Sequence, residues 1–163
     1  MEGVPSFIVN PELTTVGRSV DVGPIVIPGI GTGVAYAALD QFGQHITIPV
    51  PRRGQILEVR FHDLDDEGID KELWLFRWPP VLAADNAAFS LSDTDNPGVV
   101  AIFLFSTWRD AVNNQIGFSA NTPASYYAPE GVLYGALKTL GADNIAAGSL
   151  PSISLVIEPG VAV

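Results

Sequence analysis

Apolar residues recur along this chain in short runs that glycines and prolines interrupt. The clearest run, Gln55–His62, alternates strictly between apolar and polar residues and places Leu57, Val59 and Phe61 on one face. A period of two puts successive side chains on opposite faces of a β-strand. We therefore predict a strand with one face in a core and the other against water or a partner.

The next apolar run, Leu73–Trp78, is predicted to be the hairpin partner of this strand. Trp74, Phe76 and Trp78 share one of its faces. Three aromatic side chains give one face of this strand a large apolar area, because each ring has an extensive apolar surface. We expect these rings to lie in the core.

Further strands are predicted from runs rich in valine, isoleucine, leucine and phenylalanine. Val99–Phe105 is apolar on both faces, as is typical of a strand in the centre of a sheet. Gly131–Leu140 is assigned to a strand because Gly135 disfavours a helix. Pro49 and Pro51 indicate a sheet edge, because proline cannot donate a backbone hydrogen bond. The remaining predicted strands are Phe7–Val9, Pro24–Pro28, Val34–Ala37, Gln44–Val50 and Ile153–Ile157.

Turn residues are dense along the whole chain. There are 16 glycines and 13 prolines in 163 residues. Many short strands bounded by such residues are typical of sandwiches and barrels. We predict an all-β chain with a single, jelly-roll-like β-sandwich domain over residues 33–163. Residues 1–32 have extended-type residues and little core density, and they are predicted to form an extended N-terminal arm.

The charge balance narrows the classes of partner. Lysine and arginine number 8 against 18 acidic residues, a formal net charge of -10. Without clustered cations the chain is not expected to bind nucleic acid or an anionic membrane surface. The absence of cysteine removes disulfides, thiol nucleophiles and zinc–thiolate sites. A charged fraction of only 16% suggests that a partner covers part of the surface.

Six carboxylates are concentrated in the sequence FHDLDDEGIDKELWLF, Phe61–Phe76. Asp63, Asp65 and Glu67 follow the spacing of a calcium loop, but Trp74 stands where such a loop needs its bidentate glutamate. We interpret this acidic segment as the solvated tip of a hairpin, with a cation site as the alternative.

A second acidic group precedes Pro97. Asp93, Asp95 and Asn96 have side chains that bond nearby backbone, which is what a turn before Pro-Gly requires. A turn is again preferred over a cation site. We predict no metal site and no cofactor.

The residues that usually perform catalysis are sparse. The two histidines, His45 and His62, lie on predicted strands, and the neighbours His62 and Asp63 point to opposite faces. Ser106 and Ser119 lack the G-x-S-x-G pattern of a nucleophile elbow. We predict no catalytic residue and no enzymatic activity; a hydrolase of sandwich fold with a histidine or paired acids in a cleft is a further alternative.

Aromatic side chains suggest a different alternative, a carbohydrate-binding β-sandwich module on a virion or tail. Such a module needs exposed, coplanar rings, whereas a core needs buried ones. The sequence YYAP, Tyr126–Pro129, is predicted to be a contact loop. The candidate rings are Trp74, Trp78, Trp108, Tyr126, Tyr127 and Tyr134.

Four segments occur in a recognisable order: GVAYAALDQFGQHITIPV, GQILEVRFHDLDDEGIDKELWLFRWPP, LAADNAAFSLSDTD and GVVAIFLFSTW. Together they resemble small virion proteins of tailed bacteriophages that decorate or cement the capsid exterior. The Y-x-x-x-D-x-x-G segment of that family has its counterpart in Tyr36, Asp40 and Gly43, and its D-N-A-A-F-S-L-S-D turn in Asp85–Asp93. The resemblance covers roughly residues 33–109, about half of the chain.

This resemblance implies a non-enzymatic capsid decoration, or cement, protein. Its expected partners are the major capsid protein and further copies of itself, as a homo-oligomer or lattice, with no nucleic acid and no membrane. Its expected location is the virion, on the capsid exterior, after a period in the host cytoplasm. An extended arm could add a strand to a neighbouring sheet edge. The candidate partner-binding residues of the arm are Phe7, Ile8, Val9, Pro11 and Leu13.

Overall fold

The computed structural model describes residues 18–31, 33–119 and 123–160. This part of the chain contains β-strands and one short 3-10 helix, and no helix in it is long and apolar enough to cross a membrane. The elements are β1 (Val20–Val26), β2 (Val34–Tyr36), β3 (Gln41–Pro49), β4 (Arg53–Asp63), β5 (Lys71–Phe76), η2 (Asn96–Gly98), β6 (Val99–Asp110), β7 (Gln115–Ser119), β8 (Ala124–Tyr127), β9 (Val132–Thr139), β10 (Asp143–Ile145) and β11 (Ser152–Pro159).

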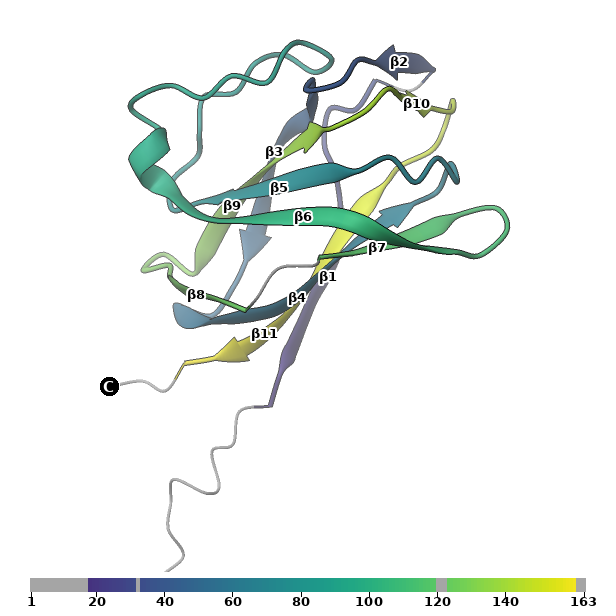
Figure 1. Cartoon of the computed structure of the whole chain (residues 1–163). Helices are drawn as coiled ribbons and strands as arrows, with labels where there is room; N and C mark the ends of the chain where they lie inside the picture. The colour runs from purple at the N-terminus through teal and green to yellow at the C-terminus, as the bar shows by residue number, and fades with distance from the viewer. Residues whose placement is uncertain (1–17, 32, 120–122, 161–163) are drawn as a thin grey trace, which may run out of the picture.

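Nine strands form one antiparallel sheet in the order β1-β11-β4-β7-β6-β5-β9-β3, with β8 paired to β4. The sheet curls until its two halves face each other, and it is nearly closed into a barrel-like shape (Figure 1). The right-handed twist of strands favours such curling. β2 and β10 form a separate pair at one end. The all-β prediction is confirmed, with one curled sheet in place of the two separate sheets of a sandwich.

The predicted hairpin between the strands at 55–62 and 73–78 is wrong. β4 pairs with β11, β7 and β8, whereas β5 lies between β6 and β9. Residues 64–70 therefore cross from one half of the curled sheet to the other. Alternation of apolar residues indicates which face of a strand is buried, but it does not indicate which strand lies beside it.

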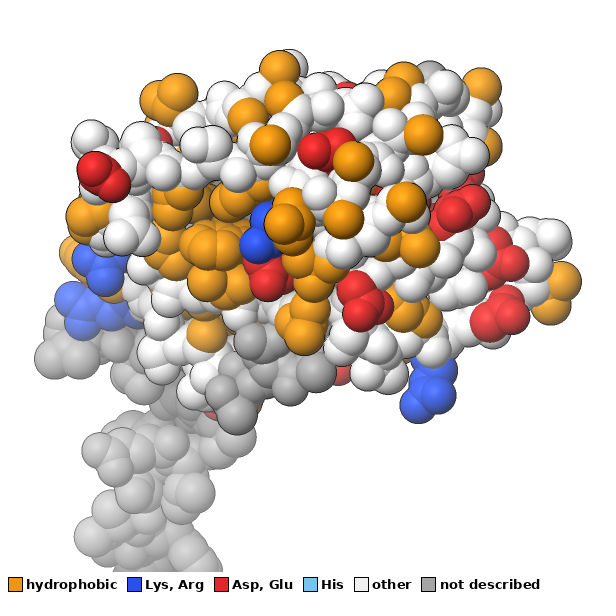
Figure 2. Space-filling model, turned by 45° about the horizontal axis from the view of Figure 1, so that its top comes forward, with side chains coloured by type: hydrophobic (Ala, Val, Ile, Leu, Met, Phe, Trp, Pro, Cys, Tyr) orange, Lys and Arg blue, Asp and Glu red, His pale blue; other side chains and the backbone are white. Residues whose placement is uncertain are grey.

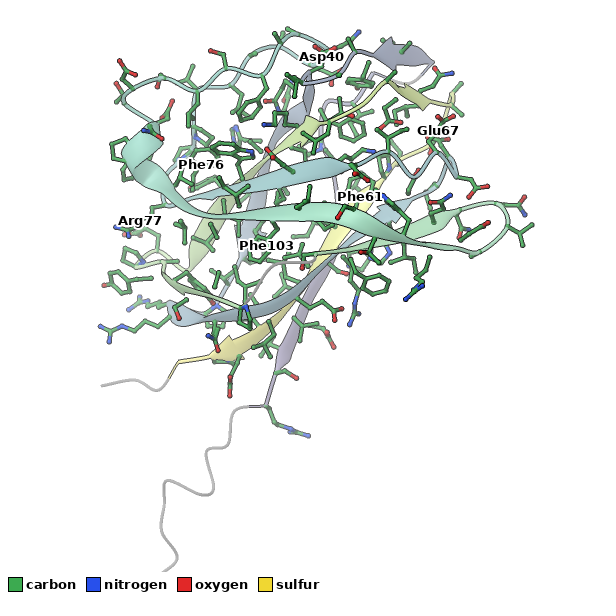
Figure 3. The ribbon with its side chains drawn as sticks, in the orientation of Figure 1. Asp40, Phe61, Glu67, Phe76, Arg77 and Phe103 are labelled. Atoms are coloured by element: carbon green, nitrogen blue, oxygen red, sulfur yellow. The ribbon has the colours of Figure 1, made fainter. Side chains whose placement is uncertain are left out.

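The core lies between the two halves of the sheet. Figure 3 shows Phe61 and Phe103 there, each 1% exposed. Burial of a side chain of this size contributes about 1.5–3 kcal/mol. Leu57, which the alternation assigned to the core, is 38% exposed, because the register against β11 shifts at Val156 and Ile56 becomes buried instead. A shift of this kind moves the following side chains to the other face.

The aromatic side chains of β5 also depart from the prediction. Leu73 and Leu75 fill the interior, while Trp74 lies half-buried on the outer face and Trp78, beyond the strand end, is 39% exposed. Phe76 is buried, but it lies outside the main core, between β5 and the long connection to η2, residues 77–95 (the 77–95 loop; Figure 3). On β5, the leucines thus pack in the interior, and the larger aromatic rings lie on the outer side of the sheet.

The described part of the predicted arm belongs to the sheet. β1 pairs with β11 at one end of the strand order, and Ile27 is buried with its N–H donating to Pro151 O at 3.1 Å. Residues 20–27 are therefore part of the folded body rather than of a free arm. Residues 1–17, which hold the predicted strand Phe7–Val9, lie outside the described residues.

Other strand predictions are confirmed. β6 includes Val99–Phe105 and lies centrally, between β5 and β7, and β9 makes Gly131–Leu140 a strand. Pro49 ends β3, an outermost strand of the sheet, as its missing N–H indicated. β7, β8 and β10 were not predicted, because their short sequences carry little alternation.

Candidate partner-binding surface

An apolar surface covers the outside of the sheet where β9, β5 and β6 run side by side. The strand register places Ala136, Trp74 and Ile102 in one row across these three strands, all on the face away from the core. Ile102 is 38% exposed and Trp74 half-buried. Hydrophobic side chains gather in this region of the surface, beside a basic and an acidic group (Figure 2). We call it the outer apolar face; Trp74, Phe89, Ile102 and Tyr134 form its accessible part, and Phe76 and Ala136 lie buried among them on the same face.

A small polar network borders this face. Trp74 Nε1 donates to Glu72 Oε2 at 2.9 Å, and the same oxygen lies 2.6 Å from Lys138 Nζ. The lysine nitrogen lies 5.3 Å from the Trp74 ring centre and 5.6 Å from that of Phe89, within range of cation–π attraction. The network holds the indole in one orientation while it remains partly accessible.

The 77–95 loop extends the apolar face. Phe89 packs against Trp74 with ring centres 5.4 Å apart. Trp78 rests on the backbone of Gly98, where an added Cβ would lie 2.6 Å from an indole carbon. The indole can lie flat there only because residue 98 is glycine. One face of each of these two tryptophans is therefore covered by the protein itself.

Asp85 ties this loop to three other segments. Its carboxylate accepts hydrogen bonds from the Gly31 N–H at 2.9 Å, the Tyr36 hydroxyl at 2.8 Å and the Gly43 N–H at 2.7 Å. Burial, followed by the hydrogen bond and charge of Asp85, raises the pKa of Tyr36 above its ordinary value. Asp85 thus joins the 77–95 loop to β2, to β3 and to the turn at Gly31; we call this set of hydrogen bonds the Asp85 clamp.

Backbone pairing continues the attachment along the start of β3. Asp40 forms an isolated bridge with Ala88, and the Phe89 N–H donates to Leu39 O at 2.9 Å. The Asp40 carboxylate accepts the Ala37 N–H at 2.8 Å and closes the preceding turn. The loop is consequently held along its middle, and the outer apolar face is a fixed surface.

In the acidic segment between β4 and β5, two carboxylates accept hydrogen bonds from other groups of the protein. Asp63 is 3% exposed, and its two oxygens accept the N–H groups of Asp65 and Gly68, each at 2.9 Å. Asp70 accepts the Trp108 indole N–H at 3.2 Å. The interpretation as a solvated hairpin tip is therefore wrong, because β4 and β5 do not pair and because Asp63 and Asp70 accept hydrogen bonds within the protein. In the described ranges, no group of three or more histidines, cysteines or acids is placed to hold a metal ion.

The second acidic group forms the predicted turn. Asp95 is buried, and its carboxylate accepts the Ser92 hydroxyl at 2.7 Å and the Val81 N–H at 3.2 Å. The hydrogen bond from Ser92 lowers the pKa of Asp95. This carboxylate therefore fixes the end of the 77–95 loop just before η2.

A histidine–serine pair lies on a different part of the surface. His62 Nε2 and Ser154 Oγ are 2.9 Å apart on the neighbouring strands β4 and β11, over an open hollow of about 480 Å³ that Asp21 and Arg60 also line. A serine hydrolase also needs a carboxylate on the second ring nitrogen and donors for an oxyanion. Neither Asp21 nor Arg60 makes a hydrogen bond to the ring in the described structure. The pair was missed because its members lie far apart in the sequence.

The candidate rings for carbohydrate binding are dispersed. Trp108 packs edge-on against Phe61 in the core, with ring centres 5.9 Å apart. Tyr126 lies in β8, and its burial raises its pKa to about 12. Tyr127 is 50% exposed beneath the Arg53 guanidinium. The predicted contact loop is thus partly a strand, and Trp108, Tyr126 and Tyr127 lie on other strands than Trp74.

The five predicted partner-binding residues of the arm lie outside the described residues. The outer apolar face was not predicted, although the two apolar faces of Val99–Phe105 are a signal for it. No family model, no curated protein and no solved structure matches this chain.

Proposed function

We propose that this protein is a non-enzymatic structural protein of a tailed-phage particle, which binds the outside of the head shell and neighbouring copies of itself. The observation that supports this proposal best is the outer apolar face, with Ile102 38% exposed beside half-buried Trp74 on a strongly acidic chain. Rigid aromatic anchors with a polar border are typical of protein–protein interfaces.

The surroundings of the tryptophans favour a protein partner over a sugar. A sugar ring stacks on a free aromatic face, whereas Phe89 and Lys138 lie against the Trp74 ring and Gly98 lies beneath Trp78. A flat protein surface needs only the outward edges of such rings together with aliphatic neighbours such as Ile102. The outer apolar face offers this combination.

The net charge of -10 suits a protein that must remain soluble before it assembles. Like charges keep free copies apart, and they favour docking on a basic patch of the shell. Because a shell repeats each site many times, modest contacts of each copy would add up through avidity. The Asp85 clamp supports this role, since a fixed surface loses little conformational entropy on binding.

The arm of residues 1–17 is proposed to contribute a second contact. β1 lies at the end of the strand order, so the chain enters the sheet along an outermost strand. Apolar residues in this segment would pair with the sheet of a neighbour by strand addition. The proposed contact residues are Phe7, Ile8, Val9, Pro11 and Leu13.

The location of the protein in purified phage particles tests the proposal. Quantitative mass spectrometry of the particle should find this chain in a fixed ratio to the major capsid protein, and labelled antibodies should bind intact heads from outside. Absence from the particle, or labelling confined to the tail, would contradict the decoration role.

A further inference from the structure

Lys71 and Asp143 form an ion pair in the interior of the molecule, far from water. Lys71 Nζ lies 2.6 Å from Asp143 Oδ2, and each side chain is 1% exposed. Lys71 begins β5 and Asp143 begins β10, so the pair connects the curled sheet to the small β2–β10 sheet.

Three aromatic rings surround the lysine nitrogen. Nζ lies 5.1 Å from the ring centre of Phe42, 5.0 Å from that of Phe61 and 5.5 Å from that of Trp108. It also donates to the Ile69 carbonyl at 2.9 Å. In apolar surroundings a buried pair of charges is unfavourable in free energy, because both groups have lost their hydration. The same atoms without charge, an amine beside a carboxylic acid, avoid that cost.

We propose that Lys71 and Asp143 condense to an intramolecular isopeptide bond after the chain folds. A proton passes from the ammonium group to Asp143 Oδ2, and the free amine attacks the carboxyl carbon. The Oδ2 hydroxyl then leaves with a proton from the nitrogen, as water. One C–N bond forms, one C–O bond breaks and one water is released. No oxidant, reductant or activating group is consumed.

The environment of Asp143 suits this step. Its other oxygen, Oδ1, accepts the backbone N–H of Asn144 at 2.9 Å. This is the oxygen that gains negative charge when the amine attacks, and a fixed donor stabilises such charge. The two groups are already in contact in the folded chain. Folding has therefore already supplied the loss of entropy that would otherwise oppose their reaction.

A third carboxyl group stands at the same end of the molecule. Glu67 lies in the 64–70 connection, near β10 (Figure 3). Desolvation, followed by the charges of Asp143 and Asp63, raises its pKa. The charge of Asp143 among these causes places Glu67 within electrostatic reach of the buried pair.

A second lysine–carboxylate pair provides an internal comparison. Lys138 Nζ and Glu72 Oε2 are also 2.6 Å apart, but their side chains are 17% and 24% exposed. Water reaches that pair and stabilises its charges, so it has no tendency to condense. The two pairs thus have the same nitrogen–oxygen distance, and they differ in how deeply their side chains are buried.

Mass spectrometry of the intact, denatured chain tests the proposal. We expect essentially all molecules to be lighter than the sequence by the mass of one water, with a single peptide pair linked between Lys71 and Asp143. Lys71→Arg should restore the full sequence mass. Asp143→Asn should lose ammonia instead of water, because the amide nitrogen then leaves. Lys138→Arg, the control, should retain the loss of one water.

Three results would overturn the proposal. These are the full sequence mass in folded wild-type protein after prolonged incubation, a loss of water that survives in Lys71→Arg, and a link mapped to any other pair. The wild-type measurement stands without any variant, so a failure of Lys71→Arg to fold cannot obscure the answer. The bond does not depend on the proposed virion function.

Discussion

Asp85 accepts a hydrogen bond from the Tyr36 hydroxyl at 2.8 Å, although the two residues lie far apart in the sequence. The contact joins the 77–95 loop to β2, and the N–H groups of Gly31 and Gly43 bind the same carboxylate. The position of the 77–95 loop, which carries Phe89 to the outer apolar face, therefore depends on hydrogen bonds to one aspartate.

Replacement of Asp85 by alanine should destabilise the fold by about 2–4 kcal/mol. Three donors would lose a charged acceptor in a partly buried place, and hydrogen bonds to charged groups are worth about 1.5–3 kcal/mol each, without full additivity. Urea unfolding followed by tryptophan fluorescence measures the change. Asp93→Ala, at an exposed acid of the same loop, is the control and should change stability by less than about 0.5 kcal/mol. Equal effects of the two variants would argue against the clamp.

Two glycines with the same backbone geometry should respond differently to alanine. Gly43 has φ 73° and Gly33 has φ 74°, so each substitution carries the cost of about 1–2 kcal/mol for a left-handed backbone. At Gly43 the new Cβ would also lie 2.7 Å from Pro28 O, whereas at Gly33 it meets open space. In thermal unfolding, Gly43→Ala should therefore have a clearly lower midpoint temperature than Gly33→Ala. If the order is reversed, the close approach at Pro28 is not a constraint.

His62 should make the folded protein sensitive to mild acid. Burial, followed by the charge of Arg60, lowers its pKa below the ordinary 6.5, so the unfolded chain binds its proton more readily than the folded chain. Stability is therefore complete above about pH 6.5 and falls as the pH decreases towards the lowered folded value. Urea unfolding at about pH 7.5 and about pH 5.5 measures this loss.

His62→Gln should reduce that pH dependence, because glutamine can bond to Ser154 without titrating. His45→Gln, at an exposed ring that contacts Tyr134, is the matched substitution at the other histidine. A profile that is unchanged in His62→Gln would assign the acid sensitivity to other groups.

A lysine on the outer apolar face should weaken binding to phage heads. Ile102→Lys places a charge among the rings of the proposed interface, and we expect a loss of tenfold or more in affinity, about 1.4 kcal/mol. Co-sedimentation with undecorated heads measures it. Leu57→Lys is a matched control, since Leu57 and Ile102 are both 38% exposed but lie on different strands, β4 and β6. Equal binding of both variants and the wild type would exclude this face as the contact.

Deletion of residues 1–17 should leave a folded protein that no longer docks on heads. The truncation keeps β1 and its pairing with β11, so the sheet retains its outermost strand. Circular dichroism and thermal unfolding should match the full chain, while co-sedimentation with heads should fall by tenfold or more, about 1.4 kcal/mol. Normal docking of the truncated protein would show that the arm is dispensable.

Sequence by itself determined much of the local structure. The strands at 55–62 and 99–105 were predictable because alternation and continuous apolar character reflect burial of one or both faces of a pleated strand. Pro49 indicated an edge through its missing N–H, and the turn near Asp95 followed from side chains that bond their own backbone. All of these properties act over a few residues.

Tertiary structure decided which distant segments meet. β4 and β5 follow each other in the chain but lie in different halves of the curled sheet, and a register shift exposes Leu57. The Asp85 clamp and the Lys71–Asp143 pair likewise join residues that no local pattern relates. The physical reason is that strand neighbours are selected by the fit of the whole interior. Every apolar strand could pair with several others, and only the complete packing distinguishes between them.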